Sequence, residues 1–214
     1  MNDPDLTPEL LLTAYASGLF PMADGRDADE VFWVDPTYRG VFPLDSFHIS
    51  RSLRRRIKRD NYQVRFNTAF RAVVLGCAER EETWINDIIF DLYLELHRLG
   101  YAHSVEVWQE DDLVGGVYGV ALGGAFFGES MFSTRTDASK IALAWLIDRL
   151  RLAGFSLFDT QFITEHLASL GAMEIPRESY QEQLASALQK NPDITLAGRV
   201  QSAAGILQRN AQTS

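Results

Sequence analysis

A run of three apolar segments between residues 103 and 132 limits the fold of this chain more than any other feature. The segments read HSVEVWQ, LVGGVYGVAL and AFFGESMF, and only the turn QEDD and the pair GG separate them. Apolar segments joined by such short polar turns predict an antiparallel meander of β-strands. A helix is expected next, from a cap at Asp137 to a stop at Gly154, with an apolar face of Leu143, Leu146, Ile147 and Leu150.

The segments on either side of the meander predict an α/β layer fold with a mixed, largely antiparallel sheet. YQVRFN, which starts at Tyr62, alternates as a strand does, and SLFDTQF after the long helix indicates another strand. Helices are expected over residues 69–77 and 88–99, around 164–170, and over about 178–189. We place this domain at residues 63–190 and expect a polar, loosely attached tail over 191–214.

Residues 1–62 predict a small N-terminal lobe. Thr7 and Pro8 are suited to open a helix, and Gly18 is suited to end it. Residues 20–47 are rich in Pro, Gly and Asp, which favours short strands and turns.

The segment 51–59 concentrates positive charge on an otherwise acidic chain. It reads RSLRRRIKR, and its six basic residues change the net charge from −15 for the rest to −9 for the whole. A helix capped by Ser50 and anchored by Leu53 and Ile57 would carry these charges. Such runs are commonly solvated helix faces, but an RNA backbone would relieve their mutual repulsion. The candidate nucleic-acid-binding residues are Arg51, Arg54, Arg55, Arg56, Lys58 and Arg59.

The composition excludes several classes of protein. With 46% hydrophobic and 11% aromatic residues, the chain can bury a sizeable core and is not expected to be disordered. A single cysteine, Cys77, argues against a disulfide framework and a cysteine-based zinc site, and the four histidines have no metal-binding spacing. The acidic start does not read as a signal peptide, and no apolar run approaches ~20 residues. We therefore expect a cytoplasmic protein without a membrane partner.

The strand SLFDTQF contains a carboxylate and a carboxamide. Asp159 and Gln161 are two residues apart, so their side chains are expected on the same face of the strand. Asp is a poor strand residue, and a strand end that turns into a loop would explain it without any function. The other interpretation is a reactive pair that orients an amine and handles its proton.

An ordered set of motifs resembles the leucyl/phenylalanyl-tRNA–protein transferase family over roughly residues 15–180. The set is HISRSLRR, TWI at 83–85, AHSVEVW at 102–108, LVGGVYGV at 113–120, FFGESMFS at 126–133, ASK at 138–140 and DTQ at 159–161, then HLASLGA and IPR. The resemblance implies transfer of Leu or Phe from aminoacyl-tRNA to proteins with an N-terminal Arg or Lys, which marks them for degradation. It also implies a GNAT-like acyltransferase domain that needs no metal and no coenzyme.

The same resemblance implies roles for single residues. Asp159 and Gln161 match the catalytic pair, and the basic segment matches the region that faces the tRNA acceptor stem. Aminolysis of an ester needs mainly positioning and proton handling, and a Gln carboxamide can accept a hydrogen bond from the attacking amine. Trp33 and Trp84 match positions that hold the terminal adenosine by stacking. The matching positions of the amino-acid pocket are Val117, Phe126 and Trp145.

Glu129 lies among the aromatic residues of FFGESMF. An unpaired carboxylate would be costly to bury there, so it needs a cation or hydrogen-bond donors. We expect it to bind a substrate cation, either the α-ammonium of the aminoacyl group or the N-terminal Arg or Lys of the acceptor. The alternative is a structural ion pair with Arg135 or Lys140.

Three other functions compete with the tRNA-dependent transferase. An acyl-CoA-dependent N-acyltransferase of the GNAT class is the main alternative, but the turn STRTDASK lacks a Gly-rich loop to cradle a pyrophosphate. A non-enzymatic RNA-binding adaptor explains the basic segment but not Glu129 or the pair Asp159 and Gln161. A peptidoglycan aminoacyltransferase resembles two tandem copies of such a domain, for which 214 residues are too few. We expect the tRNA-dependent enzyme, acting as a monomer.

Overall fold

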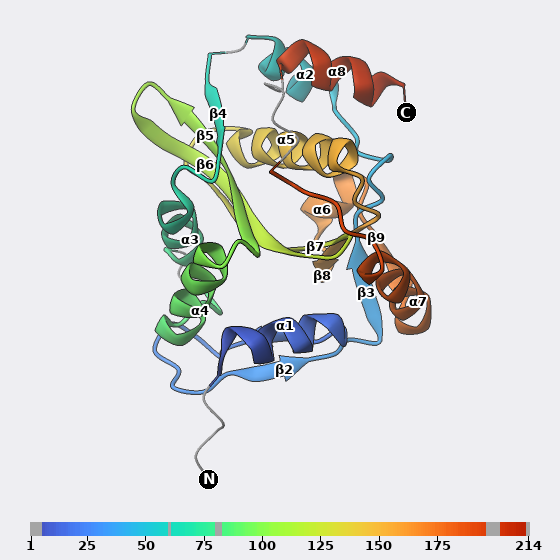
Figure 1. Ribbon diagram of the computed structural model, residues 1–214. Coiled ribbons are helices and arrows are strands. Elements are labelled where there is room, and N and C mark those ends of the chain that lie inside the picture. Colours follow the sequence, from blue (N-terminus) through green and yellow to red (C-terminus); the bar gives the residue numbers. More distant parts are fainter. Residues whose placement is uncertain (1–5, 60, 80–82, 196–201, 213–214) are drawn as a thin grey trace.

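The computed structural model describes residues 6–59, 61–79, 83–195 and 202–212, with helices on both faces of one large sheet (Figure 1). All neighbouring strands of this sheet are antiparallel except β7 (Ala125–Ser133) and β8 (Leu157–Gln161), which run parallel to each other. The expected α/β class, with an N-terminal lobe and a mixed, largely antiparallel sheet, is confirmed. The expected GNAT-like character of the domain stays a prediction. In spatial order the strands are β4 (Gln63–Phe66), β5 (Ala102–Gln109), β6 (Asp112–Leu122), β7 (Ala125–Ser133), β8 (Leu157–Gln161), β3 (Tyr38–Val41) and β9 (Met173–Pro176).

Two buried clusters lie on the two sides of the sheet. One lies between the sheet and the helices α2 (Arg51–Arg59), α5 (Ala138–Ala153) and α8 (Ala203–Ala211). The other lies between the sheet and the helices α1 (Pro8–Ala16), α3 (Phe70–Ala78), α4 (Asp87–Arg98) and α7 (Arg177–Leu188) (Figure 1). Because side chains alternate along a strand, Phe126 belongs to the first cluster and Phe127 to the second. The helices are α1 (Pro8–Ala16), α2 (Arg51–Arg59), α3 (Phe70–Ala78), α4 (Asp87–Arg98), α5 (Ala138–Ala153), α6 (Glu165–Ser169), α7 (Arg177–Leu188) and α8 (Ala203–Ala211).

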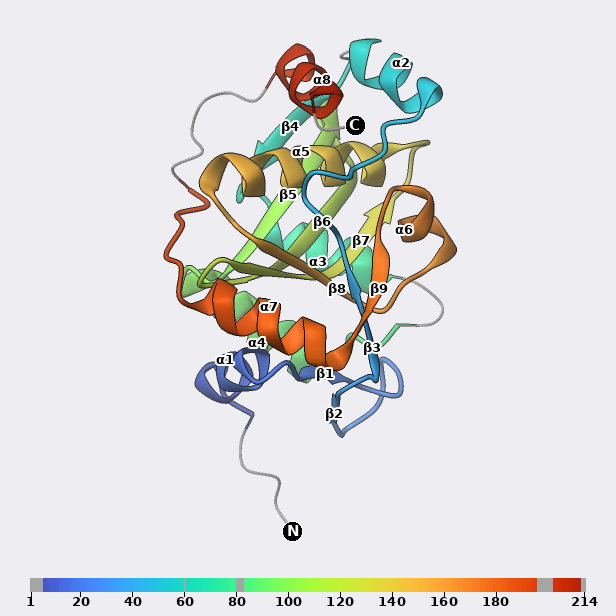
Figure 2. The same ribbon diagram turned by 90° about the vertical axis from the view of Figure 1, so that its right-hand side faces the viewer.

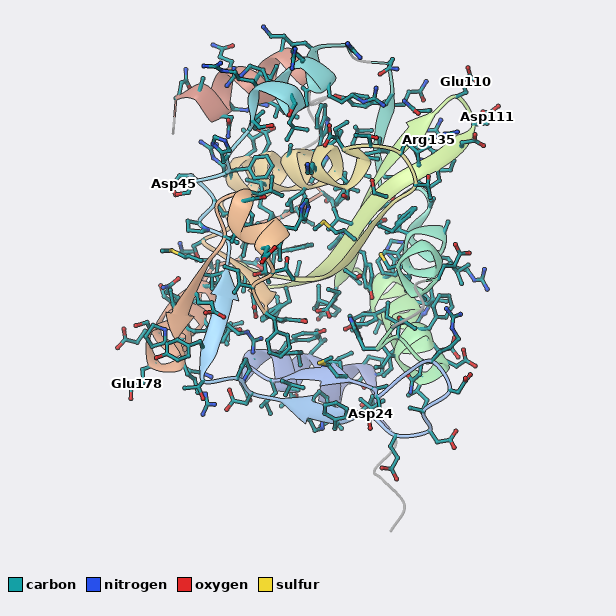
Figure 3. All side chains as sticks on the ribbon, turned by 180° about the vertical axis from the view of Figure 1, so that it is seen from behind. Asp24, Asp45, Glu110, Asp111, Arg135 and Glu178 are labelled. Carbon is teal, nitrogen blue, oxygen red and sulfur yellow. The ribbon has the colours of Figure 1, made fainter. Side chains whose placement is uncertain are left out.

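The expected meander is formed by β5, β6 and β7. The hairpin between β5 and β6 ends in an acidic tip with Glu110 and Asp111, at the same end of the molecule as Arg135 (Figure 3). Sequence patterns located these three strands because alternation and turn residues are local properties.

A β-bulge interrupts the pairing of β6 with β7 and singles out Glu129. Tyr118 pairs with Ser130 and Gly119 pairs with Gly128, so Glu129 is the extra residue on β7. A side chain at Gly119 would collide with the carbonyl oxygen of Phe127, so the bulge needs glycine there. Bulges redirect side chains and are frequent beside active sites.

The strand β3 joins the N-terminal lobe to the large sheet. It pairs with β8 on one side and with β9 on the other, although it precedes residue 62 in the chain. Figure 2 shows α1 and α7 near each other below this part of the sheet. The strand β2 (Phe32–Val34) lies below α1 in Figure 1. The lobe also holds a separate two-stranded sheet of β1 (Phe20–Met22) and β2 (Phe32–Val34). The division of the chain near residues 62 and 190 stays a prediction.

Two of the three expected helix caps are present. The hydroxyl of Thr7 accepts a hydrogen bond from the amide of Leu10, and that of Ser50 accepts one from Leu53. The cap expected at Asp137 is wrong, because this residue adopts φ 65° and its side chain caps no amide. Its carboxylate instead lies 3.0 Å from the ammonium of Lys140.

The C-terminal helix α8 is firmly packed, so the expectation of a loosely attached tail is wrong for residues 203–211. Ile206 and Leu207 are buried in the cluster beneath α5. Arg209 donates to both carboxylate oxygens of Asp148 on α5, over 2.6 and 2.7 Å. Asn210 donates to the carbonyl of Phe47, just before α2. Residues 196–201 and 213–214 of the expected tail lie outside the described residues.

We predict that Arg209→Ala lowers the free energy of unfolding by about 1–3 kcal/mol, because it removes the cation bound to the buried carboxylate of Asp148. Arg98→Ala is the matched control, since its pair with Glu95 is largely exposed and its loss is expected to leave the free energy of unfolding nearly unchanged. Urea denaturation of both variants measures this difference. Equal losses of unfolding free energy in the two variants would contradict the conclusion that Arg209 holds α8 against α5.

Candidate active site

A cleft of about 490 Å³ opens just beyond the end of the pairing between β7 and β8, at Phe127 and Asp159. Its volume lies within the range of small-molecule sites, and most of its surface is apolar. Trp84 and Phe162 are aromatic residues of the lining. The aliphatic and aromatic wall contains Val117, Met131, Leu143, Phe158 and Leu167, and the polar wall contains Glu129, Ser130, Thr160, Gln161, Thr164 and His166.

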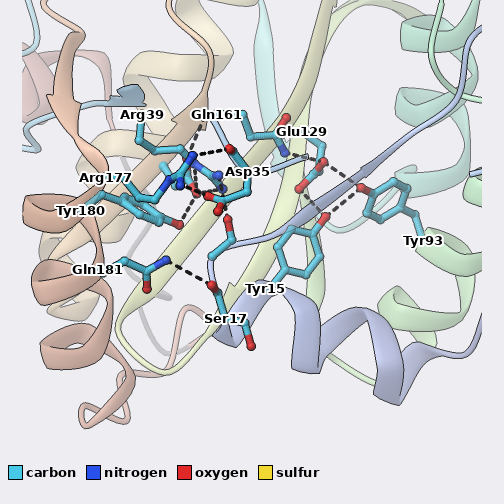
Figure 4. Close-up of polar contacts among 12 residues, drawn as sticks. Tyr15, Ser17, Asp35, Arg39, Tyr93, Glu129, Gln161, Arg177, Tyr180 and Gln181 are labelled. Atoms are coloured by element: carbon cyan, nitrogen blue, oxygen red, sulfur yellow. Dashed lines mark hydrogen bonds and ion pairs between the residues drawn. The ribbon is translucent and has the colours of Figure 1, made fainter. Parts of the chain in front are cut away.

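Glu129 is held in this cleft by three donors (Figure 4). The hydroxyl of Tyr15 on α1 donates to its Oε1 over 2.6 Å. The hydroxyl of Tyr93 on α4 and the carboxamide of Gln161 donate to its Oε2 over 2.7 and 2.9 Å. The structural ion pair with Arg135 or Lys140 is not formed, because Lys140 binds Asp137 and neither cation contacts Glu129 in the described part of the chain.

Burial gives Glu129 a proton affinity suited to neutral pH. Burial raises the pKa of the Glu129 carboxyl to about 7, and the three hydrogen bonds oppose this shift only in part. Burial and the charge of Glu129 raise the pKa values of Tyr15 and Tyr93 well above 10, so both stay protonated as donors. Of these three side chains, Glu129 is therefore the one that exchanges a proton near neutrality.

Asp159 lies behind the cleft wall and is fully buried. Arg39 of β3, itself buried, binds it through Nε and Nη2 at 2.7–3.1 Å. The hydroxyl of Tyr180 on α7 donates to the same carboxylate over 2.7 Å. The guanidinium of Arg39 lies between the rings of Phe20 and Tyr180, 4.5 and 4.6 Å from their centroids.

Gln161 connects Asp159 to Glu129. Its backbone N–H donates to Oδ1 of Asp159 over 2.7 Å, while its carboxamide donates to Glu129. Its φ of 63° lies in the left-handed region, which is unfavourable for a residue with a side chain. Such conformations persist where the surroundings enforce them, and they cluster at functional sites. Asp159 therefore fixes the turn that places the Gln161 side chain in the cleft.

The structure brings only some of the expected substrate-binding residues to the cleft. Trp84, Val117 and Glu129 line it, as does Gln161 from the expected catalytic pair. Phe126 is fully buried and packs edge-on against Phe158, behind the lining. Trp145 is buried against Tyr62, and Trp33 packs into the cluster beneath α1. None of these last three aromatic residues lines the cleft.

The basic segment forms α2, as expected, with Leu53 and Ile57 buried beneath it. Arg51, Arg55, Lys58 and Arg59 are exposed, and Arg54 and Arg56 are half-buried. No ion pair of these six side chains with an acid is present among the described residues. Positive charge on α2 is therefore unmatched within the described part of the protein.

The described part of the chain contains neither a candidate metal site nor a membrane-spanning helix. No group of three or more His, Cys, Asp or Glu side chains there could hold a metal ion. No helix there has both the length and the apolar character needed to cross a membrane.

Comparison with known proteins identifies the family. The sequence model for the leucyl/phenylalanyl-tRNA protein transferase matches residues 41–185, and the model for the N-terminal domain of the same transferase matches residues 4–37. The chain belongs to the leucyl/phenylalanyl-tRNA–protein transferase family. The resemblance inferred from the motifs is thereby confirmed.

Relatives that carry the name of this family match nearly the whole chain. The leucyl/phenylalanyl-tRNA–protein transferase of Cereibacter sphaeroides is 63% identical over 214 residues, which is 100% of both chains. That of Ruegeria pomeroyi is 62% identical over 209 residues, covering 98% of this chain and 99% of the relative. Among solved structures, FemX aligns with a TM-score of 0.47 and 14% identity, over 84% of this chain and 72% of that one.

Sequence reasoning missed four side chains that hold the site of this transferase together. They are Tyr15, Arg39, Tyr93 and Tyr180. Tyr15 and Tyr180 mark the two ends of the stretch that resembles the family, but their positions do not reveal their partners. Arg39 lies in the short strand β3, where Arg39, Gly40 and Val41 are all buried, so no alternation marks it in the sequence as a buried cation.

We predict a pH dependence of stability that is specific to Glu129. Its pKa in the folded protein, about 7, exceeds the unfolded value of ~4.3. Its contribution to stability is therefore complete below pH ~4 and is lost as the pH rises through about 7. Between these limits the free energy of unfolding of the wild type should fall by up to about 4 kcal/mol relative to that of Glu129→Gln. Denaturant unfolding from pH 4 to 8 measures this loss, and Glu95→Gln is the control at an exposed carboxylate. Parallel curves of unfolding free energy against pH for the wild type and Glu129→Gln would refute the prediction.

Proposed function

We propose that this chain transfers Leu or Phe from aminoacyl-tRNA to the N-terminal Arg or Lys of acceptor proteins, which marks them for degradation. Family membership and the names of the relatives support these substrate classes. The observation that carries the chemistry is Gln161, held at the wall of an apolar cleft by Asp159 through its backbone and by Glu129 through its side chain.

In this proposal Gln161 orients the attacking amine. Its Nε2 donates to Glu129, so its Oε1 is the atom left to accept a hydrogen bond from the acceptor's α-amino group. That bond directs the nitrogen lone pair at the ester carbonyl. A free α-amino group has a pKa near ~8, so a useful fraction is already neutral at pH 7.

Glu129 handles the proton. Attack forms the C–N bond and leaves the nitrogen with one proton too many, while the departing ribose oxygen needs one. A carboxylate with a pKa of about 7 can accept the first proton and return it to the leaving oxygen. Before attack, the same carboxylate can bind an ammonium of either substrate, which matches the role expected for it.

Asp159 acts on the reaction through Gln161. Arg39, Tyr180 and the amide of Gln161 occupy its oxygens, and it is buried away from the cleft. We therefore assign it as a positioning residue rather than as a second group that touches the amine. This divides the expected catalytic pair into one residue at the substrate and one behind it.

The cleft suits an aminoacyl adenosine. Val117 and the neighbouring apolar wall can take the Leu or Phe side chain, since each buried CH₂ contributes about 0.8 kcal/mol. Trp84 can stack on the terminal adenosine, which contributes about 1–3 kcal/mol per base. Phe126 supports this wall from behind through Phe158. Adenosine stacking by Trp33 and a pocket role for Trp145 stay predictions, since neither residue lines the cleft.

In the same proposal, the basic helix α2 binds tRNA through the phosphates of the tRNA. The acidic remainder of the chain offers complementary charge for acceptors that begin with Arg or Lys. We further propose that the protein acts as a monomer in the cytoplasm, where aminoacyl-tRNA is available.

The direct test is a transfer assay. The protein is incubated with leucyl-tRNA and a peptide that begins with Arg, and mass spectrometry should detect the peptide extended by one Leu at its N-terminus. A peptide that begins with Asp is the matched control and should stay unmodified. If acetyl-CoA modifies the peptide while leucyl-tRNA does not, the proposed function is wrong and the acyl-CoA alternative is right.

A further inference from the structure

A groove of about 450 Å³ lies between α2 and the turn that joins β7 to α5. From α2 it is lined by Ser52, Arg55, Arg56 and Arg59. From the turn it is lined by Arg135, Thr136 and Asp137. Arg135 is not part of the basic segment, and the fold alone brings it opposite α2. The groove therefore has arginine on both of its walls.

The positive charge of the groove is unmatched in the described part of the protein. None of its four arginines forms an ion pair with an acid there, and Nε of Arg56 is buried without a hydrogen-bond partner. Asp137, the acid in the lining, is bound to Lys140. Four converging guanidinium groups repel one another unless an anion lies between them.

The groove and the catalytic cleft are neighbours. Asp137 lines the groove and binds Lys140, and Leu143, three residues further along α5, lines the cleft. Lys140, in the first turn of α5, therefore lies close to both cavities. An extended anionic chain that left the groove over Lys140 would reach the cleft.

We propose that Arg135, on the wall opposite α2, is a further contact for the phosphate backbone of tRNA next to its aminoacylated end, and that the strand passes Lys140 to enter the cleft. The proposal rests on the proposed function, because it assumes that the ligand is aminoacyl-tRNA. It adds a contact residue outside the basic segment and a route from that segment to the reacting ester.

Phosphodiesters fit the groove better than carboxylates do. A guanidinium binds a phosphate through two parallel hydrogen bonds, and a nucleic-acid strand presents phosphates in a regular row. Arginines on two facing walls suit such a row, whereas the acidic tip between β5 and β6 repels it on the neighbouring side (Figure 3). Contacts of this kind read the backbone and not the bases, as suits an enzyme that accepts more than one tRNA.

The test compares Arg135→Ala with Arg71→Ala. Arg71 is an exposed arginine on α3, on the other face of the sheet, so both variants lose one exposed positive charge. Binding of leucyl-tRNA is measured between 50 and 200 mM salt, with polyglutamate as an acidic competitor. Transfer is then measured with leucyl-tRNA and with leucyl-adenosine, which has no phosphate.

One lost phosphate contact should weaken leucyl-tRNA binding by Arg135→Ala roughly five- to eight-fold at 0.1 M salt and reduce the slope of log K against log salt by about 0.7–0.9. The loss should disappear with leucyl-adenosine, and Arg71→Ala should match the wild type throughout. An unchanged slope for Arg135→Ala, an equal loss with leucyl-adenosine, or displacement of tRNA by polyglutamate would overturn the proposal. Absence of transfer by the wild type would refute the proposed function instead, and the binding slopes would still test the groove.

Discussion

The buried ion pair between Arg39 and Asp159 is the interaction on which the site depends. Both side chains are shielded from water, with exposed fractions of 2% and 0%, so each charge needs a full set of partners. Arg39 is satisfied by Asp159 and the carbonyl of Gly18, and Asp159 by Arg39, Tyr180 and the amide of Gln161. The pair joins β3 of the N-terminal lobe to β8 and α7, so the lobe and the large sheet must associate before Gln161 can be fixed.

Glu129 depends on a second convergence of distant elements. The bulge in β7 turns it toward α1 and α4, whose tyrosines bind its two oxygens, and Gln161 completes the set. Donors that are already aligned before substrate arrives need little reorganisation during the reaction. The same burial that raises the pKa of Glu129 to about 7 fits its proposed role as a proton acceptor.

Local patterns in the sequence were sufficient for the meander, the long helices and the basic helix, but not for the partners of the charged groups. Tyr15 and Tyr93 are 78 residues apart, and Arg39 and Asp159 are 120 apart, so no periodicity connects them. The short strand β9 was missed, and α8 was taken for a loose tail because it has few large apolar residues. Phe126 and Trp145 were expected in the pocket from the family resemblance, and the sequence offered no check, because an apolar residue on a strand or helix looks the same whether it lines a cleft or fills the core.

The central claim is that Asp159 acts only through Gln161, and a double-mutant cycle of single-turnover transfer rates tests it most directly. The variants are Asp159→Asn, Gln161→Ala and the two combined, each measured on protein shown to be folded by its unfolding transition. If Asp159 only positions Gln161, the combined variant should be no slower than Gln161→Ala alone, because the group that Asp159 positions is already gone. A combined loss equal to the product of the two single losses would contradict the account and make Asp159 an independent catalytic group.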